Sequence, residues 1–343
     1  MLSSDFNYHL PPELIAQQPL PQRDQSRLLV LDRASRSIHH TTFSRLPDHL
    51  SPGDCLVLND SRVLPAAFRV IRSTGGKVQG LFLAESQGLW QVMLRPSSRL
   101  KEGEPLDLLG YPGKLILAKS LGKGQWSARV EPLAPVLQIL EQIGRAPLPP
   151  YIKRQNDSDN PSDRQRYQTV FARQPGSVAA PTAGLHFNQR MFQSLQAKGI
   201  NQTYITLHVG LGTFAPIATE TIEQHHMHTE CFSISTDTVS MIQAARPAGH
   251  RTVAVGSTSL RVLESACTPG KLIPQQGQTD IYIKPGYKFA AIDALLTNFH
   301  VPRSTLLVLV CAFAWPELIF EAYQQAIDRK YRFYSYGDAM LIL

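Results

Sequence analysis

Histidines are concentrated in one stretch of this 343-residue chain, residues 176–230. Five of the eleven histidines fall there, namely His186, His208, His225, His226 and His228. Histidine has an unperturbed pKa near neutrality, so such a cluster is typical of proton transfer or metal binding. Neighbouring glycines, Gly184, Gly210 and Gly212, allow a backbone to approach a ligand closely. The stretch therefore predicts an active site.

These histidines could take part in three kinds of chemistry: metal binding, nucleophilic catalysis or acid–base catalysis. A metal site would use His226, His228, Glu230 and Cys231, because a His-x-His pair on a strand places both rings on one face. The chain contains no HExxH or comparable zinc spacing, however. Nucleophilic catalysis would need an activated Ser or Cys, and GxSxG is absent. Acid–base catalysis on an organic substrate is favoured, although the metal site and purely structural histidines stay as alternatives.

Other polar groups follow segments that are predicted to be buried strands. Residues 59–62 (NDSR) come directly after the apolar run 55–58, where open α/β sheets hold ligands. A surface turn with an exposed Arg62 is an equally good interpretation. Residues 256–259 (GSTS) open a predicted helix whose N-terminus would favour an anion, without the spacing of a phosphate-binding loop. Asn298 and His300 precede another buried run.

The composition is that of a globular protein, and its positive charge is compatible with an anionic partner although many basic proteins have none. The chain is 43% hydrophobic and carries a formal charge of +7. Its four cysteines form no CxxC pair, which favours reduced thiols over disulfides. The N-terminus has no signal-peptide pattern, and the longest apolar run, residues 304–315, is too short to span a bilayer. We expect a cytoplasmic protein without a membrane partner.

The hydrophobic pattern of residues 66–150 differs from that of the rest of the sequence. Short alternating runs broken by glycine-rich turns predict a small β-barrel or sandwich there, while strand and helix patterns alternate in the rest. Eleven Lys or Arg against six Asp or Glu give this segment a net charge of +5. We predict a discontinuous α/β domain, 1–65 and 151–343, with residues 66–150 inserted as a β-domain. The basic insert is either a polyanion-docking surface or a solvated sheet face.

The chain resembles the S-adenosylmethionine:tRNA ribosyltransferase-isomerase family of queuosine biosynthesis. The resemblance runs from end to end through DFNYHLPPELIAQ, RDQSRLLVL, GDCLVLNDSRVLPA, PPYIKR, RYQTVFA, GSVAAPTAGLHF, ITLHVGLGTFAP, HHMHTE, VGSTSLRVLES, TDIYIKPGYKF, LLTNFHVPRSTLL and YRFYSYGDAML. Departures are mild: SLRVLES stands for SVRTLES, HMHTE for HMHSE, and FAWPE lacks the usual glycine after FA. None of them removes an ionisable group.

The resemblance implies an α/β main domain with an inserted all-β barrel, and a specific reaction. The ribosyl part of S-adenosylmethionine would be transferred to 7-aminomethyl-7-deazaguanine at the tRNA wobble position and isomerised to give epoxyqueuosine. Adenine and methionine would be released. S-adenosylmethionine is then a co-substrate, tRNA is the partner, and no metal or tightly bound cofactor is expected. We also expect a monomer.

The same resemblance suggests roles for particular residues. His186 and His208 would move protons at the sugar and adenine, with His226, His228 and Glu230 as a second acid–base set. Further expected catalytic or binding residues are Asp60 and Asp280, toward the deazaguanine, and Arg62, toward a phosphate or carboxylate. The remaining expected substrate-binding residues are Asn59, Thr182, Gly184, Gly210, Gly212, Thr213, Phe214, Gly256, Thr258, Ser259, Arg261, Tyr287, Asn298, His300, Tyr336 and Asp338.

Two functions of other classes stay open. A tRNA-binding protein without catalysis would not need the dense His, Gly and Thr stretch. An S-adenosylmethionine-dependent tRNA methyltransferase would be expected to carry a glycine-rich strand-to-helix loop with a following acidic residue, and the chain shows none. The products distinguish the two reactions of S-adenosylmethionine, because methyl transfer yields S-adenosylhomocysteine whereas ribosyl transfer yields adenine and methionine.

Overall fold

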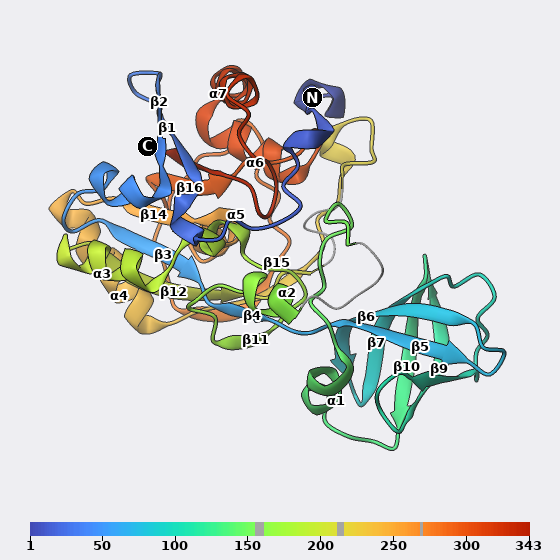
Figure 1. Cartoon of the computed structure of the whole chain (residues 1–343). Helices are drawn as coiled ribbons and strands as arrows, with labels where there is room; N and C mark the ends of the chain where they lie inside the picture. Colours follow the sequence, from blue (N-terminus) through green and yellow to red (C-terminus); the bar gives the residue numbers. More distant parts are fainter. Residues whose placement is uncertain (155–160, 211–215, 268–269) are drawn as a thin grey trace.

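A nine-stranded mixed sheet forms the centre of the larger body of the protein (Figure 1). The computed structural model describes residues 1–154, 161–210, 216–267 and 270–343, so Gly212, Thr213 and Phe214 lie outside the described residues. Across the sheet the strands are β15 (Gln275–Thr279), β13 (Glu230–Ile234), β12 (Asn201–Leu207), β3 (Cys55–Asn59), β14 (Thr252–Val255), β16 (Ala294–Asn298), β17 (Ala339–Ile342), β1 (Arg27–Asp32) and β2 (Ser37–Thr42).

Alternate residues of the central strands enter two separate cores, because side chains point to opposite faces along a strand. In β3, Cys55 and Val57 pack into one core, whereas Leu56 and Leu58 pack into the other. The first core is shared with α4 (Thr236–Ala245), α5 (Gly256–Ser265), α6 (Thr305–Ala314) and α7 (Pro316–Asp328). The second is shared with the 3-10 helix η4 (Phe43–His49) and α3 (Gln189–Ala197). Burial on both faces explains the continuous apolar run of β3.

Side-chain caps fix where several helices begin. Asn188 accepts a hydrogen bond from the backbone of Met191 at the start of α3, and Ser304 does the same for Leu307 in α6. The long apolar run of residues 304–315 contains α6. In the described residues no single helix is long and apolar enough to cross a membrane. Helices α6 and α7 pass such a test together, but they are bent by 113° at the break between them.

Six strands of the sheet run in the same direction, and four of them are neighbours. β12, β3, β14 and β16 pair in parallel, so their carboxyl ends meet at one edge, called here the carboxyl edge. β13, β17 and β1 run the opposite way and begin at that edge. The expectation that His226 and His228 share a strand is wrong, because β13 begins only at Glu230.

The smaller body is a closed barrel that projects from the sheet domain (Figure 1). Its strands, all paired antiparallel, are β5 (Ala67–Arg72), β6 (Lys77–Ser86), β7 (Leu89–Arg95), β8 (Pro105–Leu108), β9 (Lys114–Gly122) and β10 (Gln125–Glu131). Helix α1 (Val136–Ile143) packs Ile139, Leu140 and Ile143 into the barrel core. The expected α/β domain with an inserted all-β barrel is confirmed, and the sandwich alternative is not.

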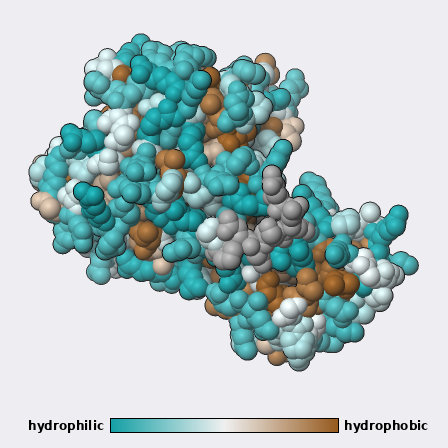
Figure 2. All heavy atoms as spheres, viewed as in Figure 1, coloured by the Kyte–Doolittle hydropathy of each residue, from teal (hydrophilic) through white to brown (hydrophobic). Residues whose placement is uncertain are grey.

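Two short strands lie where the chain passes between the sheet domain and the barrel. β4 (Ser61–Val63) precedes the barrel and pairs in parallel with β11 (Gln174–Ser177), which follows it. The short helix α2 (Pro161–Arg166) precedes β11 and lies near the junction (Figure 1). The surface of the sheet domain in this view is largely hydrophilic, as Figure 2 shows.

Candidate active site at the carboxyl edge

The strand directions bring seven of the expected site residues, together with Ser26, into one row. In sheet order the row contains Asp280, Glu230, His208, Asp60, Gly256, Asn298, Asp338 and Ser26, each at or next to a strand end on the carboxyl edge. Neighbouring strands lie about 4.8 Å apart, so His208 and Asn298, three strands apart, are separated by about 15 Å along the edge. The row therefore brings polar groups from eight strands to one edge of the sheet.

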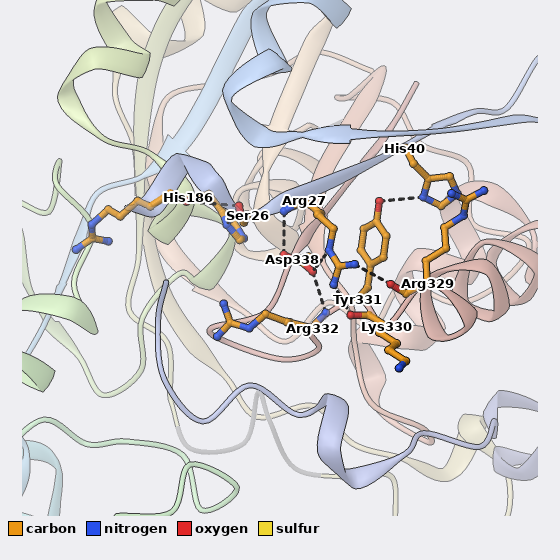
Figure 3. A network of polar contacts seen from close by, with 10 residues as sticks. Ser26, Arg27, His40, His186, Arg329, Lys330, Tyr331, Arg332 and Asp338 are labelled. Atoms are coloured by element: carbon orange, nitrogen blue, oxygen red, sulfur yellow. Dashed lines mark hydrogen bonds and ion pairs between the residues drawn. The ribbon is translucent and has the colours of Figure 1, made fainter. Parts of the chain in front are cut away.

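His186 lies at the centre of a buried hydrogen-bond network. Its Nδ1 lies 2.7 Å from Ser26 Oγ (Figure 3), its Nε2 lies 3.1 Å from Asn298 Nδ2, and its ring stacks on Phe43. Asn298 Nδ2 also donates to the carbonyl of Tyr334 at 3.3 Å, which fixes the orientation of the amide. An amide nitrogen only donates, so His186 Nε2 must accept and Nδ1 must carry the ring proton.

This network keeps His186 neutral. Burial, reinforced by the charges of Arg23 and Arg332, lowers the pKa of His186 to about 3. Both ring nitrogens are occupied by protein groups. We therefore expect His186 to stay neutral near neutral pH and to orient Asn298.

The orientation of Asn298 leaves one acceptor aimed at a cavity. Asn298 Oδ1 is buried and has no hydrogen-bond partner among the described residues. Asn298 lines two adjoining cavities of about 20 Å³ each, together with Thr182 and His300. His300 is also buried: its Nε2 lies 2.8 Å from Thr297 Oγ1, and burial lowers its pKa to about 3. A ligand that donates a hydrogen bond would satisfy Asn298 Oδ1.

The first turn of α5 lines the second of these cavities. Gly256 has φ +89°, a left-handed conformation that favours glycine, and it turns the chain from β14 into the helix. Thr258 follows, and its buried Oγ1 has no partner in the described part of the chain; the same holds for Ser259 Oγ. The helix N-terminus adds positive potential, so an anionic ligand group is favoured here.

His208 and Asp60 form a second pair, and burial shifts their pKa values in opposite directions. Burial lowers the pKa of His208, and the Asp60 carboxylate works against this shift. Burial raises the pKa of Asp60, against hydrogen bonding from Thr206 at 2.7 Å and the nearby charge of Arg173. His208 is only partly buried, and its Nδ1 has no partner among the described residues.

Gly176 explains how the His208 ring is held. A Cβ atom on Gly176 would lie 2.7 Å from His208 Cε1, closer than real side-chain contacts allow. Glycine at this position therefore lets β11 pack directly against the imidazole. A histidine with an unpaired ring nitrogen next to a carboxylate is a candidate proton acceptor, although burial lowers the pKa of His208.

A buried ion pair closes one end of the row. Arg261 of α5 donates through Nη1 to Glu230 Oε2, and Gly210 donates its backbone N–H to Glu230 Oε1 at 2.9 Å. Both side chains of the pair are about 2% exposed. Arg261 Nε and Nη2 have no partner among the described residues. His226 and His228, expected to work with Glu230, are exposed. No three His, Cys, Asp or Glu of the described ranges are grouped to hold a metal.

Two expected binding residues, Asn59 and Asp338, make hydrogen bonds within the protein. Asn59 Oδ1 accepts from the backbones of Ser61 and Leu207, tying β3 to β12. Asp338 accepts from Arg27 and from the backbone of Arg332, as Figure 3 shows.

The other expected residues lie away from the two cavities or have packing roles. Arg62 pairs with Glu141 of α1 at 2.9 Å. The Tyr287 hydroxyl donates to Glu264 at 3.1 Å, and Asp280 is exposed. Gly184 is required by close packing, because a Cβ atom there would lie 2.7 Å from Phe171.

Tyr336 lines a third cavity, which the sequence patterns do not predict. This cavity of about 30 Å³ reaches His186 and Ser26 and is also lined by Arg23 and Arg166. Ser26 precedes a strand that begins at the carboxyl edge, so the rule that ligands follow strand ends does not apply to it. The RDQS segment that contains Arg23 and Ser26 stands out only as part of the family resemblance.

The sequence and the fold are both similar to known proteins of one family. The family model of the queuosine biosynthesis protein matches residues 3–342. The chain is 47% identical to S-adenosylmethionine:tRNA ribosyltransferase-isomerase of Rubrobacter xylanophilus, covering all of this chain and 98% of that one. It is also 47% identical to the protein of that name from Halothermothrix orenii, with full coverage of both. A crystal structure of S-adenosylmethionine tRNA ribosyltransferase from Thermotoga maritima matches with TM-score 0.56 and 33% identity, covering 99% of this chain and 100% of that one.

We predict that His186 stays neutral between pH 5 and 8, protonated on Nδ1. Nitrogen-resolved NMR of the histidine rings should show two imidazoles that do not titrate in this range, those of His186 and His300, and the loss of one signal in His186→Gln identifies His186. The unfolded chain binds a proton at this residue near pH 6.5 and the folded chain only near pH 3. Stability should therefore fall as the pH drops from about 6.5 toward 3, and less so in His186→Gln. A His186 titration near pH 6.5 would contradict the assignment.

Proposed function

This chain belongs to the queuosine biosynthesis protein family, and we propose that it is an S-adenosylmethionine:tRNA ribosyltransferase-isomerase. It transfers the ribosyl moiety of S-adenosylmethionine to 7-aminomethyl-7-deazaguanine in tRNA and isomerises it, giving epoxyqueuosine and releasing adenine and methionine. S-adenosylmethionine is a co-substrate, with no tightly bound cofactor. The proposal includes a monomer in the cytoplasm.

One structural observation supports the proposal independently of the names of similar proteins. Unpaired buried polar atoms of Asn298 and Thr258, and the N-terminus of α5, surround cavities at the edge where the parallel strands end. An acceptor for an amino group and a positive site for a carboxylate match the two polar groups of the methionine part of S-adenosylmethionine. We assign Asn298 Oδ1 to an amino group of a substrate and the start of α5 to the methionine carboxylate.

We assign the first proton transfer to His208. A sulfonium acidifies the hydrogens on its neighbouring carbons, including ribose C5′, so a modest base can begin the reaction. His208 Nδ1 is buried without a partner among the described residues and the Asp60 carboxylate lies nearby, whereas both nitrogens of His186 have protein partners. Asp60 stabilises the imidazolium that forms when His208 takes the proton. His186 acts through Asn298 as a positioning residue.

We propose that residues 66–150 form a tRNA-docking module. Its net charge of +5 accounts for most of the +7 of the whole chain. Lys101 and Lys123 are exposed on the barrel, and neither takes part in an ion pair among the described residues. Exposed cations of this kind attract phosphates and release counterions when RNA binds.

A product assay tests the function directly. Purified protein, S-adenosylmethionine and tRNA carrying 7-aminomethyl-7-deazaguanine should yield adenine and methionine, with a matching mass gain on the tRNA nucleoside. Unmodified tRNA is the control and should yield neither product. Formation of S-adenosylhomocysteine would instead establish a methyltransferase. Binding of tRNA without any product would leave a non-catalytic tRNA-binding protein.

The pH dependence of kcat/KM distinguishes the roles of His208 and Asp60. His208→Gln should lower kcat by about 10²–10⁴-fold and remove the acidic limb of the profile. Asp60→Asn removes the charge that raises the pKa of His208, so the acidic limb should move to lower pH. Loss of the limb in Asp60→Asn with its retention in His208→Gln would reverse the two assignments.

Charge reversal on the barrel tests the docking module. Lys123→Glu should weaken tRNA binding and flatten its salt dependence, because a phosphate that this lysine no longer neutralises keeps its condensed counterions. The matched control is Arg36→Glu, an exposed cation in the turn between β1 and β2, at the opposite edge of the sheet. A salt dependence equal to that of the wild type would mean that Lys123 faces solvent in the complex.

A further inference from the structure

A broad hollow lies on the surface between the 3-10 helix η3 (Arg23–Gln25), α2 and the start of α3. Its volume is about 690 Å³, far larger than that of the cavities at the carboxyl edge. Four arginines line it and define what we call the arginine hollow: Arg23, Arg164, Arg166 and Arg190. The other charged residue of the lining is Asp24, so the lining carries a clear excess of positive charge.

The two inner arginines of the hollow are held by backbone carbonyls. Arg23 donates to the carbonyls of Leu185, Gln165 and Gln168 at 2.8–3.1 Å. Arg166 donates to the carbonyls of Leu20 and Pro21. A carbonyl orients a guanidinium without neutralising it, so both side chains keep their full charge. Burial, with the nearby charge of Arg166, lowers the pKa of Arg23 to about 10, which still leaves it cationic near neutral pH.

The outer arginines form the rim. Arg190, in the first turn of α3, is exposed, and no ion pair with it is found among the described residues. Arg164 donates to three carbonyls at the end of α1 and lies 3.8 Å from Glu141, which offsets part of its charge. Charge is therefore arranged at two depths, which suits a polyanion better than a single small anion.

The hollow adjoins the inner cavity that reaches His186. Arg23 and Arg166 line both. Arg166 Nε and the Tyr336 hydroxyl are buried and have no partner in the described part of the chain, and both residues line the inner cavity. Unpaired donors thus continue from the surface toward the row of residues at the carboxyl edge.

We infer that the arginine hollow binds the phosphates of the RNA strand beside the modified nucleotide. This inference rests on the proposed function. A base that reacts inside an enzyme must leave its stack, so the phosphates that flank it stay at the mouth of the site. Arg23 and Arg166 contact the phosphate closest to the reacting nucleotide, while Arg164 and Arg190 contact the next ones along the strand.

Substitution of Arg190 tests the inference with little risk to folding, because this side chain is exposed. Binding of the modified tRNA is measured at salt concentrations from about 50 to about 300 mM for wild type, Arg190→Gln and Arg190→Glu, with Arg36→Glu as the control of equal charge change. We expect the slope of log K against log salt to fall by about 0.7–0.9 in Arg190→Gln, as when one phosphate fewer is neutralised. Affinity should fall further in Arg190→Glu, and Arg36→Glu should behave as the wild type.

A kinetic readout separates the RNA from the small substrate. In the product assay, Arg190→Glu should raise KM for tRNA roughly tenfold, the equivalent of about 1.4 kcal/mol, and leave KM for S-adenosylmethionine unchanged. An equal rise in both KM values would mean a general disturbance of the site and would overturn the inference. So would a salt slope identical to that of the wild type.

Failure of the proposed function looks different. If the wild-type protein releases neither adenine nor methionine but binds tRNA with a salt slope that depends on Arg190, the RNA surface stands and the reaction does not. If the wild-type protein forms the products and Arg190→Glu matches Arg36→Glu in every measurement, the reaction stands and the arginine hollow is not the docking surface.

Discussion

The common direction of β12, β3, β14 and β16 determines where this protein can hold a substrate. Four parallel strands with apolar interiors must be buried on both faces, so their polar continuations can meet only at an edge. β13, β17 and β1 run the other way and bring the beginnings of their strands to the same place. Residues far apart in the chain, such as Ser26 near its start and Asp338 near its end, become neighbours in this row.

Hydrogen bonding then decides which polar groups of the row are available to a ligand. Asn59 and Asn298 both end central strands, and both are almost fully buried. The carbonyl oxygen of Asn59 accepts two backbone N–H groups, whereas that of Asn298 accepts none among the described residues. Leaving a buried acceptor unpaired costs about 1–3 kcal/mol. A substrate donor would recover that free energy on binding, which favours Asn298 as a binding group and Asn59 as a strand tie.

The sequence predicts well which residues lie at strand ends. It predicts poorly which other residues their side chains contact. Asp60 and Gly256 follow apolar runs, and this local pattern correctly places them at an edge. Their partners depend on contacts between distant segments, so the packing of Gly176 against the His208 ring does not follow from spacing. The contrast between His186 and His208 is of the same kind, because burial and a second hydrogen bond decide the pKa and neither is visible in a histidine motif.

Polar residues in similar sequence contexts have different hydrogen-bond partners in the structure. Asp338 and Tyr287 lie in turn-like segments with the composition of a binding loop, yet one holds two arginines and the other a buried glutamate. The boundary of the β insert is easier to anticipate, because a change from apolar runs to short alternating ones is a local property. The closure of the barrel is not local, and only the family resemblance indicates it.

The joint between the two bodies links the barrel to the arginine hollow. Glu141 at the end of α1 is approached by Arg62, just after β3, and by Arg164, on α2. Arg164 also donates to the final carbonyls of α1, where a cation offsets the negative end of the helix. An arginine that lines the hollow is thus anchored to the helix that packs on the barrel. If RNA contacts both the barrel and the hollow, this joint must keep a fixed geometry for the reacting nucleotide to reach the carboxyl edge.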